Sequence, residues 1–440
     1  MKTNQTTVKT QLEDDPPGSQ LTQVGREADE EPPSRQIITN NRRRFFSHVP
    51  DSDWNDWRWH FRNRITSVEE LAKYIPLSSK EKTQIKLVIT KYPFAVTPYY
   101  LSLVDADDPH DPIRKQAVPC FQEIAMADMG TEDPLEEKRD SVVPGLVHRY
   151  PDRVLMVLTD ICSMLCRHCT RKREWQNGGW IRTQAEIEPM MDYIRRNKQV
   201  RDIVISGGDP LTLNTSYLEE ILKELRSISH VEIIRIGTRF PVVLPQRIDA
   251  ELCNMLSKHG PIWLNTHFNH PRELTPEAAR ACDMLLRAGV PVSNQAVLMR
   301  GVNDTVDTQM KLNHELLKAK VRPYYLFQCD DVQGTEHLHT PLGTGMKIME
   351  QMRGRTSGLA IPTFVVDLPG GGGKIPIMPN YILSQSEDEF MLRNYQGRVF
   401  NFRNPMAPEP SKSGRRNGSR ETNQLAFPKL VPLLKGEEIN

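Results

Sequence analysis

Short apolar runs alternate with amphipathic segments through the central part of the chain. Runs of this kind predict strands, and six follow one another at Val154–Leu158, Asp202–Ser206, Val231–Gly237, Pro261–His267, Val292–Leu298 and Arg322–Gln328. Between them, Tyr217–Leu225 and Pro276–Leu286 carry apolar residues at helical spacing. Several of the strands recur about every thirty residues, which is the length of a βα unit.

Consecutive units of strand and helix predict an α/β fold. We expect a partial parallel (β/α)6-type barrel, preceded by an N-terminal helical domain and followed by a C-terminal extension. A doubly wound open sheet is the alternative. In both architectures ligands bind at the carboxyl ends of the strands, so polar residues directly after each strand are candidate site residues.

Changes in composition along the chain suggest its division into parts. In the aromatic-bearing N-terminal part, Ser67 and Glu70 have the spacing of a capping box and predict the start of a helix. Both chain ends are polar and lack apolar periodicity, which favours disorder. The predicted parts are a disordered tail at 1–44, a helical domain at 45–140, a barrel domain at 141–355, a C-terminal segment at 356–403 and a disordered tail at 404–440.

The charge balance bears on the kind of partner. The 440 residues include 57 Lys and Arg against 56 Asp and Glu, a formal net charge of +1. Such a chain has no overall attraction to nucleic acid or to an anionic membrane, so we expect a small-molecule partner. No apolar run reaches membrane-spanning length, and no apolar signal core follows the first residues. We therefore expect a cytoplasmic protein.

Three of the seven cysteines follow the first predicted strand, at Cys162, Cys166 and Cys169. Thiolates this close in sequence can hold one soft metal centre. Structural zinc and ordinary cubane clusters use four protein ligands, so three cysteines suggest a cluster with one open iron. A zinc knuckle completed by His168 is an alternative, but this histidine adjoins Cys169 and cannot easily reach the same ion. A disulfide framework does not suit clustered cysteines in a long chain.

Polar residues follow the later strands as well. Ser206, Gly207, Gly208 and Asp209 come after the second strand. Small glycines let a backbone approach a ligand closely, and the carboxylate that follows offers a partner to an ammonium group. Most such runs are only turns. Further along, the polar residues at strand ends are Thr238, Arg239, His267, His270, Gln295, Asp330 and Asp331.

A seventh apolar run, Phe364–Pro369, leads into four glycines and Lys374. The run does not fit a phosphate-binding P-loop, because Ile375 stands where Ser or Thr would bind magnesium. A lysine on a flexible, unhindered loop can instead form a Schiff base with an aldehyde such as pyridoxal phosphate. A mobile surface loop with a solvated lysine is the alternative.

The spacing C-x-x-x-C-x-x-C after an early strand resembles the radical S-adenosylmethionine superfamily. This resemblance implies that the three cysteines hold a [4Fe-4S] cluster and that S-adenosylmethionine chelates the fourth iron. From about Ser52 to about Arg403 the chain resembles the lysine 2,3-aminomutase family. The motifs that carry this second resemblance are Asp53–Trp59, Cys162–Arg173, Ser206–Leu211, Arg322–Tyr325 with Cys329 and Asp330, and Val366–Lys374.

The resemblance implies a role for each matching residue. Lys374 would be the catalytic residue that binds pyridoxal phosphate covalently, and Arg149 and Arg153 would hold its phosphate. Arg171 would bind the substrate carboxylate through its planar fork. Two acids, Asp330 and Asp367, would receive the distal ammonium of lysine, since a buried cation needs compensation. The residues implied to bind S-adenosylmethionine are His168, Ser206, Gly207, Gly208, Asp209, His267 and Gln295.

The implied activity is an isomerisation that moves the α-amino group of L-lysine to the β-carbon. The resemblance adds a 5′-deoxyadenosyl radical, an electron donor such as flavodoxin or ferredoxin, and a homo-oligomer. Two features depart from the family pattern. No cysteine follows Cys329, so the intersubunit zinc site of some members is expected to be absent, and Phe327 replaces a tyrosine found in some relatives.

Three rival functions remain at this level. The same migration could act on arginine or glutamate. A different radical S-adenosylmethionine enzyme would need no pyridoxal phosphate, and Lys374 would then be structural. An iron-sulfur electron carrier would need neither an open iron nor the glycine-lysine segment, so both features count against it.

Overall fold

The computed structural model describes residues 41–126, 128–176 and 178–405. Most of the two tails predicted to be disordered, 1–40 and 406–440, therefore lies outside the described residues. The described residues up to Pro379 form one compact unit, and those from Asn380 onward form a second. In the described residues, no helix is long and apolar enough to cross a membrane.

Short helices make up the N-terminal region, as predicted. Ser67 caps one of them, with its Oγ accepting the backbone N–H of Glu70 at 3.2 Å. Trp54 and Trp57 are buried in the core. The helices are α2 (Asp51–Trp54), α3 (Trp57–Arg62), α4 (Val68–Leu71), α5 (Ser79–Lys91), α6 (Pro98–Leu101), α7 (Pro112–Ala117) and α8 (Gln122–Ala125).

The helical region begins before the predicted limit at residue 45. Residues 41–46 are helical. Asn41 is buried, and its Nδ2 donates to the carbonyls of Ser102 at 3.1 Å and Val104 at 2.6 Å. The prediction of disorder was wrong for residues 41–44, because a buried amide that satisfies two carbonyls leaves no trace in apolar periodicity.

Within the described residues, ten strands form the main sheet in the order of the sequence, and seven of them, β3 to β9, are parallel. β1 and β2 pair antiparallel before β3, and β10 pairs antiparallel with β9. The strands are β1 (Ser141–Val143), β2 (Leu146–Tyr150), β3 (Arg153–Val157), β4 (Asp202–Ser206), β5 (Ile233–Gly237), β6 (Ile262–Thr266), β7 (Val292–Leu298), β8 (Arg322–Gln328), β9 (Thr363–Leu368) and β10 (Gly373–Pro376).

This strand order decides between the two predicted architectures. A doubly wound sheet reverses its order at a switch point, whereas a barrel adds each strand beside the one before it. The order from β3 to β9 never reverses. The α/β prediction is therefore confirmed in its barrel-like form, and the doubly wound alternative is wrong.

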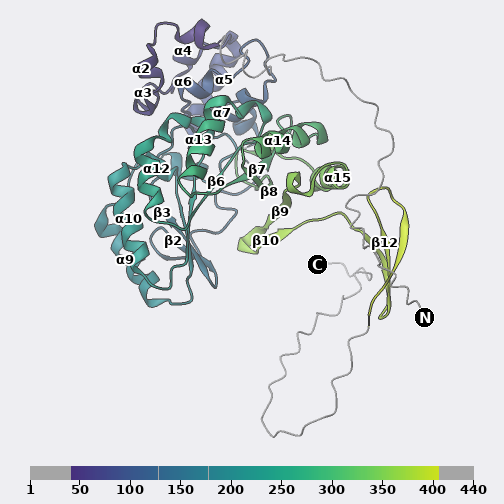
Figure 1. The fold of residues 1–440 in the computed structure, drawn as a ribbon. Coiled ribbons are helices and arrows are strands. Elements are labelled where there is room, and N and C mark those ends of the chain that lie inside the picture. The colour runs from purple at the N-terminus through teal and green to yellow at the C-terminus, as the bar shows by residue number, and fades with distance from the viewer. Residues whose placement is uncertain (1–40, 127, 177, 406–440) are drawn as a thin grey trace, which may run out of the picture. The chain divides into compact units, whose positions relative to one another are not determined.

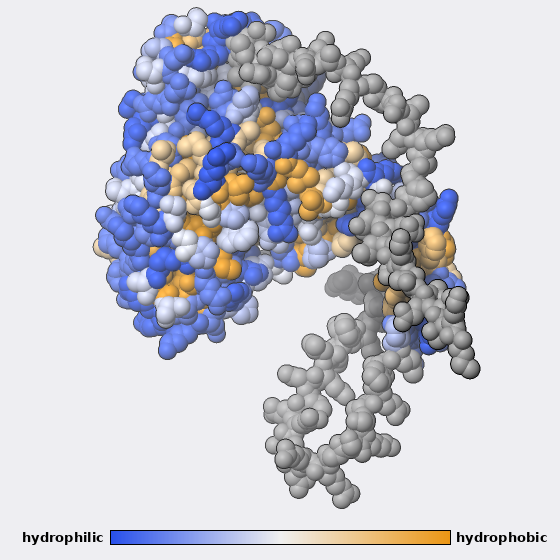
Figure 2. Space-filling view, viewed as in Figure 1, coloured by the Kyte–Doolittle hydropathy of each residue, from blue (hydrophilic) through white to orange (hydrophobic). Residues whose placement is uncertain are grey.

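Amphipathic helices connect the parallel strands and cover the outer side of the sheet (Figure 1). α10, for example, buries Leu218, Ile221, Leu222 and Leu225, which share one helical face. Polar side chains dominate the outer helices on the face that Figure 2 shows. The connecting helices are α9 (Gln184–Arg196), α10 (Thr215–Ser227), α11 (Phe240–Val243), α12 (Ala250–Ser257), α13 (Pro276–Arg287), α14 (Val306–Lys318) and α15 (Leu342–Met352).

The curled sheet brings its two antiparallel margins together. The backbone N–H of Lys374 on β10 donates to the Tyr150 hydroxyl at the end of β2, at 3.0 Å. Arg139, just before β1, donates to the Gly370 carbonyl just before β10, at 2.8 Å. These contacts tie the β9–β10 hairpin to the β1–β2 side of the sheet, although the two margins do not pair as neighbours in the sheet.

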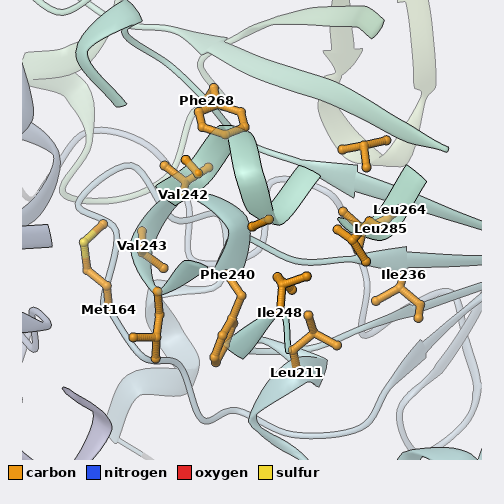
Figure 3. Close-up of a cluster of buried hydrophobic side chains, with 14 of the residues drawn as sticks. Met164, Leu211, Ile236, Phe240, Val242, Val243, Ile248, Leu264, Phe268 and Leu285 are labelled. Atoms are coloured by element: carbon orange, nitrogen blue, oxygen red, sulfur yellow. The ribbon is translucent and has the colours of Figure 1, made fainter. Parts of the chain in front are cut away.

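The cysteine loop after β3 is anchored in the core. Met164, between the first two cysteines, is buried and lies in an apolar cluster with Phe240 and Val243 (Figure 3). The N-terminal region holds the loop backbone, since Leu165 N–H donates to the Ala95 carbonyl and Arg167 N–H donates to the Gln116 carbonyl, both at 2.9 Å. The helical region therefore helps to shape the loop.

The second unit contains an antiparallel sheet of β11 (Ile382–Gln385), β12 (Glu389–Arg393) and β13 (Val399–Arg403). Several large apolar side chains of this sheet are exposed, among them Val399, Phe400 and Phe402. The homo-oligomer expected from the sequence stays a prediction.

Candidate active site

A cavity of about 940 Å³ runs along one face of the parallel strands and reaches the loops that follow their carboxyl ends. Most of the residues named above as candidate site residues line it, from the three cysteines to Lys374, but His270 and Asp331 do not. The structure thus brings together residues that lie more than two hundred positions apart in the sequence. Their roles as ligands of particular cofactors stay predictions.

The three cysteine sulfurs are spread more widely than a single zinc ion requires. Tetrahedral zinc, with Zn–S bonds of about 2.3 Å, places its sulfurs about 3.8 Å apart. Within the described residues, the sulfurs of Cys162, Cys166 and Cys169 do not all lie within 4.8 Å of one another. This spacing does not match a single tetrahedral zinc ion held by all three sulfurs.

Hydrogen-bond donors reach two of these sulfurs. Cys166 Sγ accepts from Arg239 Nη1 at 3.0 Å, and Cys169 Sγ accepts from the backbone N–H of Arg171 at 3.3 Å. Burial raises the pKa of the Cys162 and Cys169 thiols. A bound metal is the ordinary means of ionising such buried thiols, so the loop is built for thiolates that a metal centre stabilises.

Gly207 and Gly208 bring the loop after β4 against the cysteine loop. Gly208 N–H donates to the Thr159 carbonyl at 2.5 Å. A side chain at Gly207, whose φ is 137°, would collide with the Thr159 backbone, and one at Gly208 would collide with the Asp160 backbone. Their small size thus permits close contact between two loops. The role toward S-adenosylmethionine that the resemblance implies for these glycines stays a prediction.

Asp209 is buried and occupied by protein partners. Its carboxylate accepts from Leu211 N–H at 3.1 Å, the Thr238 hydroxyl at 2.6 Å and Arg239 N–H at 2.8 Å. Burial raises the pKa of Asp209 to about 7, against the hydrogen bonds that favour the ionised form. The carboxylate therefore fixes the segment after β5, which the sequence did not predict.

Two histidines in the cavity are neutral. Burial lowers the pKa of His168 well below its usual range, and burial together with Arg239 lowers that of His267 to about 4. His168 Nδ1 is buried and has no hydrogen-bond partner among the described residues. Because buried polar atoms are normally paired, this nitrogen marks a place for a polar ligand group. Gln295, on β7, also lines the cavity.

Arg171 already has a carboxylate partner within the chain. Its Nε and Nη2 donate to the two oxygens of Glu137 at 3.0 and 2.7 Å, and its Nη1 donates to the Gly207 carbonyl at 3.0 Å and the Ser206 hydroxyl at 3.4 Å. Burial opposes the ionisation of Glu137, but Arg171 and Arg173 outweigh it and lower its pKa to about 2. The fork expected to bind a substrate carboxylate thus holds one from the protein.

Lys374 lies on a strand, not on the flexible loop expected from the glycines. Gly370, Gly371 and Gly373 have φ values of 64°, 71° and 84°, so they form a tight turn between β9 and β10. In the resulting pairing Lys374 lies directly opposite Asp367. The expectation was wrong because positive φ at three glycines folds the chain back into a hairpin.

The Lys374 ammonium lies 2.6 Å from Asp367 Oδ2 and 4.0 Å from the centre of the Phe327 ring. Phe327 therefore offers the lysine an aromatic face. Asp330, after β8, is close enough for the charges of Asp367 and Lys374 to shift its pKa. Burial first, and then the negative charge of Asp367, raise the pKa of Asp330 to about 7, while Lys374 lowers it. Asp367 is therefore the ion-pair partner of Lys374, and Asp330 lies near enough for both charges to shift its pKa.

Arg149 and Arg153 flank the tight turn between β2 and β3. Arg149 Nε donates to Asp140 Oδ2 at 2.7 Å. The Arg153 guanidinium lies 4.1 Å from the centre of the Tyr150 ring, and the hydroxyl of this tyrosine accepts the backbone N–H of Lys374. Two cations therefore line the cavity beside the lysine strand.

Comparison with known proteins identifies the family. The chain is 54% identical over 373 residues to the L-lysine 2,3-aminomutase of Clostridium subterminale, a match that covers 85% of this chain and 90% of that protein. The chain belongs to the lysine 2,3-aminomutase family. Within that family it also resembles the L-lysine 2,3-aminomutase of Bacillus subtilis, with 50% identity over 82% of this chain and 76% of that one.

Two family models place the chain in the same group. Residues 156–308 match the radical SAM superfamily, which implies a [4Fe-4S] cluster and S-adenosylmethionine, and residues 349–426 match a model described as lysine-2,3-aminomutase. The glutamate 2,3-aminomutase of Clostridioides difficile is 45% identical over 82% of this chain and 86% of its own length. Streptococcus suis SuiB bound to S-adenosylmethionine matches half of this chain with 12% identity and a TM-score of 0.37, too low to bear on its function.

This member of the lysine 2,3-aminomutase family has site residues that the sequence reading missed. Glu137, which holds Arg171, lies outside the regular elements, so no pattern marked it. The role of Tyr150 could not be predicted, because it contacts Lys374, which lies 224 positions away in the sequence. Arg239 was noted only as a polar strand end, and its contact with Cys166 depends on the folded loop.

A buried ion cluster also lies beside the cysteine loop. Glu123, which is inaccessible to solvent, accepts from Arg167 Nη2 at 2.6 Å and from Lys172 Nζ at 2.8 Å, and both cations are 1% exposed. Arg167 also donates to the carbonyls of Pro93 and Tyr92. These contacts join the later part of the cysteine loop and the segment that follows it to the N-terminal region.

Proposed function

We propose that this chain moves the α-amino group of L-lysine to the β-carbon and so produces β-lysine. Its membership of the lysine 2,3-aminomutase family supports the reaction type. The single observation that carries the choice of substrate is the pair of acids, Asp330 and Asp367, that line the cavity close to the Lys374 ammonium. That end of the site is suited to a cation.

The residues present fit the cofactors that the family requires. Cys162, Cys166 and Cys169 would hold the cluster, whose fourth iron is left to S-adenosylmethionine, and the orphaned Nδ1 of His168 offers a polar partner in the same cavity. Lys374 would bind pyridoxal phosphate, with Arg149 and Arg153 toward its phosphate. When bound, these groups supply a radical that removes a hydrogen atom and a π system through which nitrogen migrates.

Lys374 has to change partners when it binds an aldehyde. As a free ammonium it neutralises Asp367. A Lys374 nitrogen held by the cofactor would be drawn away from Asp367, and Asp367 would then be available to the ammonium of the substrate side chain. The ionised form of Asp330 would then add a second charge-assisted hydrogen bond to the same ammonium.

Arg171 also has to exchange partners if it binds the substrate carboxylate. Glu137 occupies its Nε and Nη2, which are the two donors best placed for bidentate binding. Arg173 Nη2 lies 2.8 Å from Glu137 Oε2, so a displaced Glu137 keeps a cation. Exchange of one carboxylate for another therefore leaves no buried acid without a partner.

The same acids disfavour glutamate, the substrate named for one relative. A distal carboxylate would meet Asp330 and Asp367 and leave like charges together in a partly buried site. Arginine carries a distal cation but needs a longer, planar space. Lysine places one compact ammonium between two carboxylates.

The test is anaerobic incubation of the reconstituted, reduced protein with S-adenosylmethionine, pyridoxal phosphate and L-lysine. A chemical reductant or a flavodoxin-type donor serves to reduce the cluster. We expect β-lysine to form, and to be lost on omission of either small cofactor or in Cys169→Ala. Fully loaded protein that forms no β-lysine would contradict the proposal, and product formed without pyridoxal phosphate would favour a different radical enzyme.

A further inference from the structure

Arg239 is a buried arginine whose guanidinium reaches a cysteine of the site. It follows β5, is 7% exposed, and its Nη1 lies 3.0 Å from Cys166 Sγ. The other nitrogens have fixed acceptors. Nη2 donates to Gln116 Oε1 at 2.6 Å and to Glu273 Oε1 at 2.8 Å, and Nε donates to the His267 carbonyl at 3.1 Å.

The groups that hold Arg239 are themselves held. Glu273 is inaccessible to solvent and also accepts from the Tyr100 hydroxyl at 2.6 Å and from the backbone N–H groups of Asn269 and His270 at 2.5 and 2.9 Å. From the other side, Asp209 accepts the backbone N–H of Arg239. The arginine is thus fixed by residues from four separate parts of the chain.

A second arginine shows that burial beside the cysteine loop does not by itself bring a guanidinium to a sulfur. Arg167 directly follows Cys166 in sequence and is 1% exposed. Its donors go to Glu123 and to the carbonyls of Pro93 and Tyr92. Arg239, which is distant in sequence, is the arginine with a donor at the thiol.

We propose that Arg239 raises the reduction potential of the iron-sulfur cluster through its hydrogen bond to Cys166, and that Asp209 and Glu273 are positioning residues for it. The proposal rests on the cluster that the proposed function requires. Reduction adds one negative charge to the cluster. A cation and an N–H···S contact stabilise the reduced form more than the oxidised form, and hydrogen bonds to cluster sulfurs are a known determinant of potential.

The geometry favours arginine for this task. A guanidinium presents its donors in a rigid plane, so one edge can be held by Glu273 and Gln116 while another points at the sulfur. A lysine at this position could keep the charge but could not satisfy the same acceptors. Because the site is shielded from water, the charge acts on the cluster with little screening.

The test is a redox titration of the reconstituted full-length protein without S-adenosylmethionine, followed by electron paramagnetic resonance. The variants are Arg239→Gln, Arg239→Lys and, as a matched control, Arg64→Gln. Arg64 lies beside the same loop but donates from Nη1 to the Cys162 carbonyl at 2.6 Å, not to a sulfur. Iron and sulfide contents are measured for each protein.

We expect Arg239→Gln to shift the equilibrium toward the oxidised cluster at least tenfold, which is about 59 mV for a one-electron couple. Arg239→Lys should shift it less and in the same direction, and Arg64→Gln should shift it less than threefold. If Arg239→Gln assembles no cluster, the shift in reduction potential of Arg239→Lys decides whether the proposal holds. Unchanged potentials in both Arg239 variants, or an equal shift in Arg64→Gln, would overturn the proposal.

The two proposals fail in different ways. A wild-type protein that shows no [4Fe-4S] signal after reconstitution contradicts the proposed function and this inference together. A complete cluster with the same potential in wild type and in the Arg239 variants contradicts this inference alone, since formation of β-lysine is measured separately.

Discussion

Two charged regions lie at or beside the cavity, one around the cysteines (the cysteine end) and one around Lys374 (the lysine end), and their ion pairs differ in burial. At the cysteine end, the cations Arg167 and Arg239 are buried and paired with the buried acids Glu123 and Glu273. At the lysine end, Lys374 pairs with Asp367 on the neighbouring strand, both residues line the cavity, and the Lys374 side chain is 26% exposed. The first set of ion pairs is buried within the fold, whereas under the proposed function the second would exchange partners when ligands bind.

The comparison distinguishes ion pairs that form when the chain folds from ion pairs that would change when ligands bind. A metal cluster benefits from donors that are already oriented, because their ordering is completed when the chain folds. A substrate with two charged ends must instead displace groups that keep the empty site neutral. Substitutions at the cysteine end should therefore affect stability and redox behaviour, and those at the lysine end should affect binding and turnover.

Lys374→Ala should have the largest effect at the lysine end, because it removes both the amine proposed to bind the cofactor and the cation paired with Asp367. We expect formation of β-lysine to fall on the order of 10³-fold or more, because the cofactor loses its covalent attachment. The iron content should stay at the wild-type value. Borohydride reduction of the wild-type protein, followed by peptide mapping, should fix the pyridoxyl group on Lys374. A pyridoxyl group on another lysine, or loss of iron in the variant, would count against the separation of the two ends.

Glu123→Gln tests the cysteine end. The change leaves Arg167 and Lys172 buried without their anion, so we expect a loss of about 3–5 kcal/mol in the free energy of unfolding. Chemical denaturation of the cofactor-free protein measures this loss. Glu188→Gln, which removes an exposed partner of Arg195, should change little. Similar stability in the two variants would contradict a structural role for the buried cluster.

The pH dependence of lysine binding tests Asp330. Its pKa of about 7 is raised above that of an ordinary carboxyl, so below pH 7 a proton has to leave before an ammonium can bind. We expect the KM for L-lysine to rise up to about tenfold per pH unit as pH falls below 7. Measurements between pH 6 and 8 follow this trend directly.

Asp330→Asn should remove that pH dependence and raise the KM at pH 8 by about 30-fold, equivalent to about 2 kcal/mol. The exposed neighbour provides the control, since Asp331→Asn should leave both quantities near the wild-type values. An unchanged pH profile in Asp330→Asn would show that another group titrates.

Glu137→Gln gives the smallest expected effect. The neutral amide competes less well for Arg171, so the substrate carboxylate should bind more easily and the KM for L-lysine should fall about threefold. Steady-state kinetics at saturating cofactors measure this change. A KM that rises instead would mean that Glu137 orients Arg171 and does not leave it.

The parts of the fold that follow apolar periodicity could be predicted from the sequence. The ranges Asp202–Ser206, Val292–Leu298 and Arg322–Gln328 match β4, β7 and β8 to the residue. These strands are bounded by turns and polar residues, so their limits are marked locally. The cavity could be anticipated too, because parallel strands place their carboxyl ends at one edge.

What the sequence could not indicate depends on contacts between distant residues. The glycines before Lys374 were read as flexible, but their positive φ values form a hairpin that the pairing of β9 and β10 stabilises. The partners of Asp209 and Arg171 are set by where loops meet. Apolar periodicity and motif spacing are local patterns, so they do not predict which hydrogen-bond donor will contact which acid where two distant loops meet.

The proposed choice of lysine is tested most directly by competition between two substrates. Reconstituted, reduced protein is incubated anaerobically with equal concentrations of isotopically distinct L-lysine and L-glutamate, and the two β-amino acids are quantified in one sample. With two carboxyl groups at the distal end of the site, β-lysine should exceed β-glutamate by at least 100-fold, about 2.7 kcal/mol. Comparable amounts, or an excess of β-glutamate, would contradict the assignment of Asp330 and Asp367 to an ammonium.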